Sequence, residues 1–261
     1  MSKFCSLFSS SSANSTYISS QGSAILVDAG NSAKQILLSC ERHGLETDEI
    51  KAIFITHEHT DHVKGVRVLA GKLGVPVYAT EKTLQSMINK KVVDEKTEII
   101  PVSPAGESVG GMEIIPFSTP HDSVDSVGYV VMLPDSRKIS ICTDLGVVTD
   151  TVFNAVSKSD LILLESNHDI NMLKNGPYDP ALKRRILSQF GHLPNTDCAA
   201  TALKLLESGT TRFVLGHLSK QNNTPKIAYA ETKRAFDSIG AEENFDYTLS
   251  IASDDNEIIR I

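Results

Sequence analysis

The sequence predicts an α/β domain in which mixed β-sheets pack face to face, with helices on the outside. Short apolar runs typical of strands alternate with longer helical patterns along the whole chain. The second half of the chain repeats the ordering of strands and helices found in the first half. Neither a linker nor a low-complexity segment interrupts the 261 residues, so we expect a single domain over 1–261.

Strands are expected wherever a short apolar run is bounded by turn residues. The clearest of them is 161–164, in which every residue is apolar. A hairpin is expected across Pro134-Asp135-Ser136, and short strands should flank Gly110-Gly111 between 99 and 117. The other predicted strands are 4–8, 16–18, 24–27, 52–55, 77–79, 127–133, 138–142, 212–215, 247–251 and 257–261.

Helices are expected where apolar residues recur at helical spacing between capping residues. The helix over 33–43 can be capped by Asn31 or Ser32, and Gly44 can end it because glycine tolerates a positive φ. The other predicted helices are 63–73, 81–89, 149–157, 180–189, 195–208 and 224–239.

The composition is that of an ordinary globular protein with 41% hydrophobic and 22% charged residues. A net charge of −7 argues against a surface that coats nucleic acid, although a metal site could still attract phosphate. The four cysteines form no Cys-x-x-Cys pair, and no apolar run suits a signal peptide or a membrane span. We therefore expect free thiols, a cytoplasmic location and no membrane partner, and the sequence predicts no particular oligomeric state.

The stretch 56–65, Thr-His-Glu-His-Thr-Asp-His-Val-Lys-Gly, places three histidines and an aspartate directly after an apolar run. His57 and His59 are two positions apart, so in an extended segment they share a face and can grip one metal. Asp61 and His62 follow where the chain turns, and they can hold a second metal at a neighbouring position. Gly65 leaves room for a tight entry into the next helix.

Three further residues, His121, Asp144 and His217, each come just after an apolar strand. Their strand ends can meet at the same sheet edge, where loops on a rigid scaffold carry function. A carboxylate such as Asp144 has two oxygens and can bridge two cations. Imidazole and carboxylate donors suit zinc best, and manganese or iron as alternatives, so we expect two divalent metal ions. The predicted ligands are His57, His59, Asp61, His62, His121, Asp144 and His217.

Residues 56–62 resemble the signature of the metallo-β-lactamase fold superfamily, and Leu-Val-Asp-Ala-Gly at 26–30 matches another of its motifs. The sequence is further similar to the YycJ/WalJ group of bacterial metallo-hydrolases. This resemblance implies a four-layer αββα sandwich of two mixed β-sheets flanked by helices, with the metals at one sheet edge. It also implies phosphodiesterase or nuclease-like activity. The segments that carry the narrower resemblance are 7–15, 165–169, 191–193 and 216–224.

We expect a dinuclear-metal-dependent hydrolase in which a metal-bridging hydroxide attacks a phosphodiester, with DNA or RNA ends as candidate substrates. In this hypothesis His57, His59 and His121 hold one metal. Asp61, His62 and His217 hold the other, and Asp144 bridges them. Asp61 thereby counts among the catalytic residues.

Substrate contacts are expected from residues beside the ligands. His192 could contact the substrate phosphate or protonate the leaving oxygen, or it could be a helix-entry histidine that only caps or packs. Asn195, followed by Thr196, places amide donors at a helix N-terminus, which is an anion site. Ser12 and Asn14 lie in a serine-rich turn over 9–15 that is either a tight hairpin or a loop beside an anion.

One more histidine and two rival functions remain open. His168 either orients a metal ligand or is a polar loop residue. The first rival function is an acyl hydrolase of the glyoxalase or lactonase kind, which would use the same metals on a thioester or lactone. The second is a non-catalytic module that binds a metal or a nucleotide, and the complete ligand set argues against it.

Overall fold

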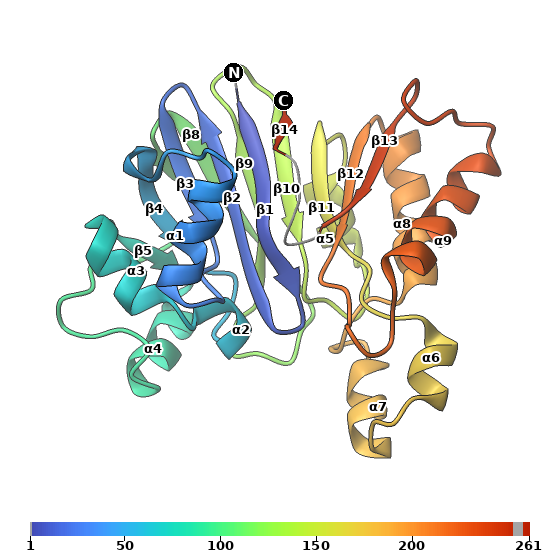
Figure 1. The fold of residues 1–261 in the computed structure, drawn as a ribbon, viewed down its shortest axis with the longest axis horizontal. Helices are drawn as coiled ribbons and strands as arrows, with labels where there is room; N and C mark the ends of the chain where they lie inside the picture. The colour runs from blue at the N-terminus through green and yellow to red at the C-terminus, as the bar shows by residue number, and fades with distance from the viewer. Residues whose placement is uncertain (1, 253–257) are drawn as a thin grey trace. The chain divides into compact units, whose positions relative to one another are not determined.

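Parallel and antiparallel strand pairs combine into two mixed β-sheets of seven strands each, flanked by helices, in the computed structural model, which describes residues 2–252 and 258–261 (Figure 1). The predicted fold class is thereby confirmed. The strand order of the first sheet is β14 (Ile259–Arg260), β1 (Lys3–Ser10), β2 (Ala13–Ser20), β3 (Ser23–Val27), β4 (Ile50–Phe54), β5 (Val77–Ala79) and β6 (Ile99–Pro101). That of the second is β13 (Thr248–Ile251), β12 (Arg212–Gly216), β11 (Leu161–Glu165), β10 (Lys138–Cys142), β9 (Val127–Met132), β8 (Met112–Ser118) and β7 (Glu107–Val109).

The helices follow the predicted pattern with two additions, α2 and α6. None of the helices in the described part of the chain combines the length and apolarity that a membrane span requires. A 3-10 turn, η1, covers Thr47–Glu49. The α-helices are α1 (Ala33–Arg42), α2 (Thr60–Val63), α3 (Val66–Leu73), α4 (Glu81–Asn89), α5 (Asp150–Val156), α6 (Ile170–Asn175), α7 (Pro180–Ile186), α8 (Asn195–Glu207) and α9 (Pro225–Asp237).

The described residues form two compact units, each built from separate chain segments. The first unit contains residues 2–116, 123–137 and 258–261. The second contains residues 117–122 and 138–252. That the whole chain is one domain over 1–261 stays a prediction.

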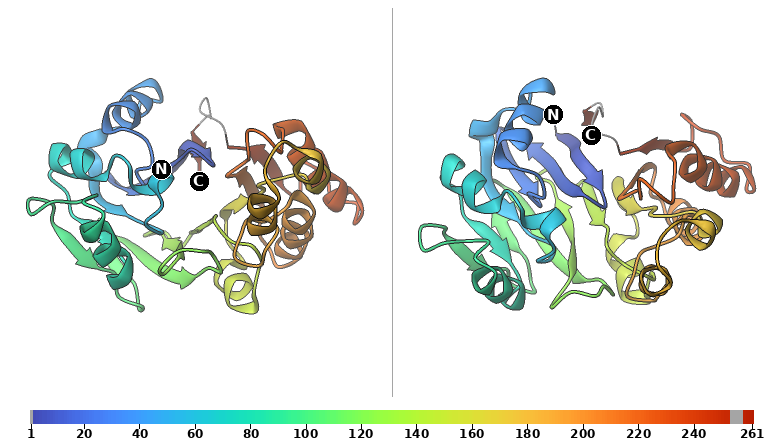
Figure 2. Two further views of the ribbon diagram at one scale, coloured as in Figure 1. Left: turned by 90° about the horizontal axis from the view of Figure 1, so that it is seen from below. Right: turned by 60° about the horizontal axis from the view of Figure 1, so that its bottom comes forward.

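In the first unit, helices α1, α3 and α4 lie along the first sheet (Figure 2). The buried side chains Ile36 of α1, Leu69 of α3 and Leu84 of α4 belong to one core cluster with Ile53 of β4. This core has two sides. The helices contribute apolar residues at helical spacing, and the central parallel strand contributes its own apolar residues. The same core fixes the end of β4, from which the histidine-rich stretch starts.

The segment 9–15 forms the tight hairpin that was one of its two predicted alternatives. Only Ser11 and Ser12 form the turn, and β1 and β2 include the rest of the segment. Asn14 and Ser15 are buried in β2. Their polar side chains have internal partners, since the Ser15 hydroxyl donates to the Asp28 carbonyl at 2.9 Å. The hydroxyl-rich composition therefore serves a strand whose polar groups are satisfied inside the unit.

The predicted helix over 63–73 begins later than expected, as α3 at Val66, and the separate short helix α2 precedes it. The chain bends at Gly65, whose N–H donates to the carbonyl of Ala29 at 2.8 Å. A β-carbon at Gly65 would lie 2.1 Å from the carbonyl oxygen of Asn31. The close approach confirms that this entry needs glycine, and it places Asp61 and His62 on a short helix of their own.

Other helix and strand ends differ from the predicted ones, and hydrogen bonds near these ends explain the difference. The predicted helix over 180–189 ends at Ile186, because the Ile186 carbonyl accepts from the N–H of His192 at 3.0 Å as the chain folds back. Helix α6 was not predicted, although Asp169 caps it through the N–H of Met172 at 2.8 Å. The predicted strand over 257–261 corresponds to β14, and Glu257 lies outside the described residues.

In the second unit, β10, β11, β12 and β13 run parallel, and α8 and α9 pack against each other beside them (Figure 1). The registers pair Cys142 with Leu164 and Glu165 with Gly216. The carboxyl ends of parallel strands lie at one edge of a sheet. Asp144 after β10 and His217 after β12 therefore leave the sheet at the same edge, as the sequence predicts.

Replacing Gly65 by alanine is expected to destabilise the protein by about 1–3 kcal/mol, because the new β-carbon forces the α2–α3 bend away from Asn31. Chemical denaturation followed by circular dichroism measures the change. The matched control is Gly71→Ala, since a β-carbon at Gly71 in α3 meets nothing within 4 Å. That variant should gain about 0.5–1 kcal/mol from helix propensity. Equal stabilities of the two variants would contradict the role assigned to Gly65.

Candidate metal centre

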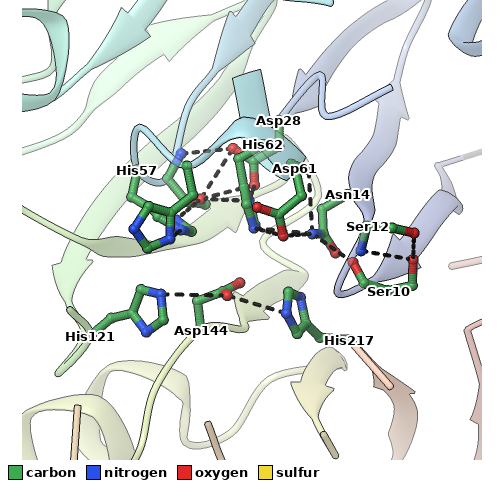
Figure 3. A network of polar contacts seen from close by, with 12 residues as sticks. Ser10, Ser12, Asn14, Asp28, His57, Asp61, His62, His121, Asp144 and His217 are labelled. Carbon is green, nitrogen blue, oxygen red and sulfur yellow. Dashed lines mark hydrogen bonds and ion pairs between the residues drawn. The ribbon is translucent and has the colours of Figure 1, made fainter. Parts of the chain in front are cut away.

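The first cluster of ligands lies in the first unit, on the loop after β4 and on α2 (Figure 3). His57 Nε2 and His59 Nδ1 are 3.0 Å apart, close to the roughly 3.3 Å between two nitrogens on a tetrahedral zinc. His62 Nε2 lies 3.5 Å from Asp61 Oδ2, and the rings of His57 and His62 have centroids 4.1 Å apart. All four predicted ligands of the histidine-rich stretch therefore gather at one place.

Asp28, at the end of β3, fixes the orientation of His62. The His62 Nδ1–H donates to Asp28 Oδ2 at 2.8 Å, so the lone pair of Nε2 faces the other ligands. Thr56 donates to the same carboxylate through its N–H at 2.8 Å and its hydroxyl at 2.9 Å. Burial raises the pKa of Asp28, and His62 and Thr56 act in the opposite direction.

Changing Asp28 to asparagine is expected to weaken metal binding by about 10–100-fold. An amide has one acceptor oxygen, so either the Thr56 N–H or the His62 Nδ1–H would face an NH₂ group. Titration with zinc against a chelator measures the affinity, and Asp48→Asn, at an exposed position in η1, is the control. Unchanged zinc affinity would show that Asp28 does not orient His62.

Asn14 of β2 lies inside this first cluster, whereas Ser12 lies at the exposed hairpin turn. The Asn14 Nδ2 is 3.0 Å from His62 Nε2 and 3.4 Å from Asp61 Oδ2 (Figure 3). The hairpin thus delivers an amide to the ligands, while the Ser12 hydroxyl lies 2.9 Å from that of Ser10. Gly30 permits the approach, because a β-carbon there would lie 1.6 Å from the Asp61 carbonyl oxygen.

The second cluster lies in the second unit and is centred on Asp144 (Figure 3). Asp144 Oδ1 is 3.3 Å from His217 Nε2 and 3.8 Å from His121 Nε2. His121 Nδ1–H donates to the Gly191 carbonyl at 3.1 Å, which again directs Nε2 toward the ligands. Burial lowers the pKa of His121, while Asp144 acts against this change. The three predicted ligands of this unit therefore lie together.

Backbone strain coincides with these ligands. Asp144 has a φ of 61° and His217 a φ of 56°, and Asp28 in the first unit has a φ of 64°. Such left-handed conformations cost a non-glycine residue about 1–3 kcal/mol and persist only where surrounding contacts impose them. Two of these three residues are predicted ligands, and the third is the carboxylate that orients His62.

Glu165 is a site residue that the sequence analysis did not assign. It ends β11, is fully buried, and accepts the Nδ1–H of His192 at 2.8 Å. Its other oxygen accepts the N–H of Leu145 at 2.9 Å. The available signal was its position, because it follows a wholly apolar strand at the edge that also carries Asp144 and His217.

The contact with Glu165 also changes the pKa of His192. Burial alone would lower the pKa of His192, but the charge and hydrogen bond of Glu165 outweigh burial, and the pKa is raised to about 9. The ring of His192 stacks on that of His217, with centroids 5.2 Å apart and an interplanar angle of 16°. The structure therefore places His192 beside His217, and its role as a proton donor stays a prediction.

Three asparagines join the loops that carry the second cluster. Asn167 Nδ2 donates to the carbonyl of His217 at 2.9 Å and so supports its left-handed backbone. Asn195 is only 2% exposed, and its amide group is paired with that of Asn223, with both amide contacts at 2.9 Å. The structure places Asn195 in the packing of these loops, and a direct substrate contact by its side chain stays a prediction.

His168 is buried beside Asn167, with its Nδ1 3.3 Å from the Asn167 Oδ1. Burial lowers the pKa of His168 to about 4, so the ring is neutral. Its carbonyl accepts the N–H of Asn195 at 2.9 Å. His168 is therefore part of the loop packing that supports His217 through Asn167, and it is not an exposed polar residue.

The donor chemistry of each cluster suits a divalent cation. Imidazole nitrogens and carboxylate oxygens are the ligands that zinc and similar metals take. His62 and His121 each use the second ring nitrogen for a bond to the protein, as metal-binding histidines do. In the second unit, ligand atoms of His121, Asp144 and His192 lie within 4.8 Å of one another. The fold and these two clusters are those of a metal-binding hydrolase.

Residues 23–218 match the family model described as the β-lactamase superfamily domain. The chain is 40% identical over 230 residues to the exodeoxyribonuclease WalJ of Streptococcus pneumoniae serotype 2, a match that covers 87% of this chain and 85% of that protein. It is 34% identical over 240 residues to the exodeoxyribonuclease YycJ of Bacillus anthracis, covering 91% and 90%. The chain therefore belongs to the β-lactamase superfamily and, within it, to the WalJ/YycJ family, as the resemblance implied.

Solved structures agree on the fold. The metallo-β-lactamase fold protein YhfI from Bacillus subtilis superposes with a TM-score of 0.74 at 18% identity, covering 99% of this chain and 98% of that one. A diphosphatase of the PhnP family superposes with a TM-score of 0.68 at 19% identity, covering 99% and 96%. These likenesses extend over the whole fold, and they show the fold alone.

Proposed function

We propose that this protein is a metal-dependent exonuclease that hydrolyses phosphodiester bonds at DNA ends. The names of the WalJ and YycJ relatives support this assignment. The observation that carries it is the position of His192, which is hydrogen-bonded to buried Glu165 and stacked on His217. A nucleotide leaving group departs as an alkoxide that needs a proton, whereas a thiolate leaves without one. A positioned acid therefore favours a phosphodiester over the thioester alternative.

We propose that the seven predicted ligands hold two divalent metal ions, with zinc preferred over manganese or iron. His57, His59 and His121 would bind one ion, and Asp61, His62 and His217 the other. Asp144, whose two oxygens can each take a cation, would bridge them. When bound, such ions supply a nucleophile at neutral pH and offset charge on the phosphate oxygens.

The side chains of the protein have separate roles in this proposal. His192 keeps its Nδ1–H on Glu165 and carries the transferable proton on Nε2, which it gives to the leaving oxygen. Asn14 and Ser12 would offer amide and hydroxyl donors to the phosphate. Asp28 and Thr56 hold His62 in its ligand orientation and do not touch the substrate.

The test is a substrate comparison with protein loaded with zinc, manganese or iron. We expect hydrolysis of bis-p-nitrophenyl phosphate and release of mononucleotides from end-labelled DNA, with RNA tested in parallel. A panel of thioesters and lactones covers the acyl hydrolase alternative. Turnover of thioesters or lactones without phosphodiester cleavage would overturn the proposed function, and release of internal fragments would overturn the preference for ends.

We also propose a cytoplasmic location. All four cysteines in the described part of the chain are free and buried, as predicted. Burial raises the pKa of each of these thiols, to about 11 for Cys40 and about 12 for Cys5. Unpaired, protonated thiols suit a reducing compartment, where disulfides are rare. Fractionation of the producing cells, followed by detection with an antibody, checks this location.

A further inference from the structure

The segment 170–190, which carries α6 and α7, projects beyond the strands of the second unit (Figure 1). It has four cationic residues and one acidic residue, so its net charge is +3 in a chain whose total is −7. The acidic residue is Asp179, which caps α7 by accepting the N–H of Ala181 at 2.8 Å. The segment is thus a local basic surface on an acidic protein. Its cations are Lys174, Lys183, Arg184 and Arg185.

Two large apolar side chains are exposed on the same segment, directly after the end of α7. Phe190 is 49% exposed and Leu187 is 42% exposed. In the sequence, Phe190 is two positions before His192, the proposed proton donor. Lys174 and Arg184 are exposed on the same segment, and Lys183 is half-buried with its Nζ donating to the Lys174 carbonyl at 2.8 Å. Exposed aromatic rings and cations together bind single-stranded nucleic acid, through base stacking and phosphate contacts.

The backbone around Phe190 is bonded to the site. The Phe190 carbonyl accepts the N–H of Asp122 at 3.0 Å, and the next carbonyl, of Gly191, accepts from His121 Nδ1 at 3.1 Å. The N–H of His192 donates to the Ile186 carbonyl at 3.0 Å. The exposed ring is therefore presented from a backbone whose bonds also orient His121 and place His192.

Helix α7 is fixed against the same loop. A β-carbon at Gly191 would lie 2.2 Å from the Ile186 carbonyl oxygen and 2.3 Å from that of Arg185, so the last turn of α7 lies directly on the chain there. Arg185 also forms an ion pair with Asp122, with one contact of 2.9 Å to Asp122 Oδ1. These contacts hold the basic helix at the second ligand cluster.

We propose that this surface, defined by Lys174, Lys183, Arg184 and the ring of Phe190 and here called the basic shelf, holds the single-stranded end of a polynucleotide substrate. A base stacks on Phe190, and the neighbouring phosphates face the three cations. The inference rests on the proposed function, because it assigns a substrate subsite to the same centre. An acidic peptide would satisfy the cations but not the flat aromatic face, so a nucleic-acid strand accounts for both features.

The first test is Phe190→Ala in the metal-loaded full chain. We expect the KM for a single-stranded DNA oligonucleotide to rise roughly tenfold, because one base loses its stacking partner. The kcat, and the turnover of bis-p-nitrophenyl phosphate, should stay at the wild-type values. Phe190→Trp should restore the DNA KM, since it keeps an aromatic face. The matched control is Phe245→Ala, which removes a phenylalanine that is 86% exposed elsewhere in the second unit.

The second test is Arg184→Ala, with the salt dependence of the DNA KM as its readout. Loss of one phosphate contact should lower the slope of log KM against log salt concentration by roughly 0.7 for a single strand. Lys204→Ala is the control. It removes an exposed cation from the last turn of α8, outside the segment 170–190.

The outcomes show whether the basic shelf or the proposed function is wrong. If the wild-type protein cleaves neither bis-p-nitrophenyl phosphate nor DNA with any metal, the proposed function is wrong. If it cleaves both, and Phe190→Ala and Arg184→Ala match Phe245→Ala and Lys204→Ala in DNA KM and salt slope, the basic shelf is overturned as a nucleic-acid surface. A raised KM for DNA alone, rescued by Phe190→Trp, supports it.

Discussion

Phosphodiester turnover is expected to fall by roughly a thousandfold or more when Asp144 is replaced by asparagine, because loss of the proposed bridge removes several kcal/mol of transition-state stabilisation. Asparagine also tolerates the left-handed φ of 61° that Asp144 adopts, so the loop should keep its conformation. The loss of turnover should therefore be due to the missing carboxylate charge. Initial rates on bis-p-nitrophenyl phosphate and the metal content of the purified variant are the two measurements.

Metal analysis distinguishes a lost bridge from a general defect. We expect fewer metal ions per chain in Asp144→Asn than in the wild type, with an unchanged circular dichroism spectrum. Asp150→Asn is the matched control, since Asp150 is exposed at the start of α5 six residues further along the chain. Full activity in Asp144→Asn would rule out the bridging role.

The second large effect is expected from His192→Asn. Its amide can still donate to Glu165, which avoids an uncompensated buried carboxylate, but it has no transferable proton. We expect the kcat on DNA to fall by about 10²–10⁴-fold, the range for loss of a general acid. On bis-p-nitrophenyl phosphate the loss should be much smaller, because p-nitrophenolate leaves without protonation.

This difference between substrates identifies the role of His192. A residue that only maintained the structure would lower both activities together, and a metal ligand would lower the metal content. We expect the metal content of His192→Asn to match the wild type. Equal losses on DNA and on bis-p-nitrophenyl phosphate would contradict the proton-donor assignment. The basic shelf is distinguished from it by kinetics, because Phe190→Ala should change KM and leave kcat unaffected.

Local sequence signals were sufficient for most of the secondary structure. Strands such as β11, whose apolar residues are continuous, and helices such as α4, which Thr80 caps, follow from rules that act within about ten residues. The misplaced boundaries have tertiary causes. The bend at Gly65, after which α3 begins, depends on Asn31, more than thirty residues earlier in the chain, and the end of α7 depends on a bond to His192.

The sequence alone determined which residues are candidates for the metal ligands, because three histidines and an aspartate gather within six positions at 57–62, directly after an apolar strand. It also determined the family, through the stretch 56–62. The tertiary structure decided the roles of the residues around them. Glu165 is buried against His192 only because β11 brings it to the edge that β10 and β12 share, and the raised pKa of His192 comes from that contact. Burial and partner distance depend on packing between segments far apart in the chain, which no local pattern contains.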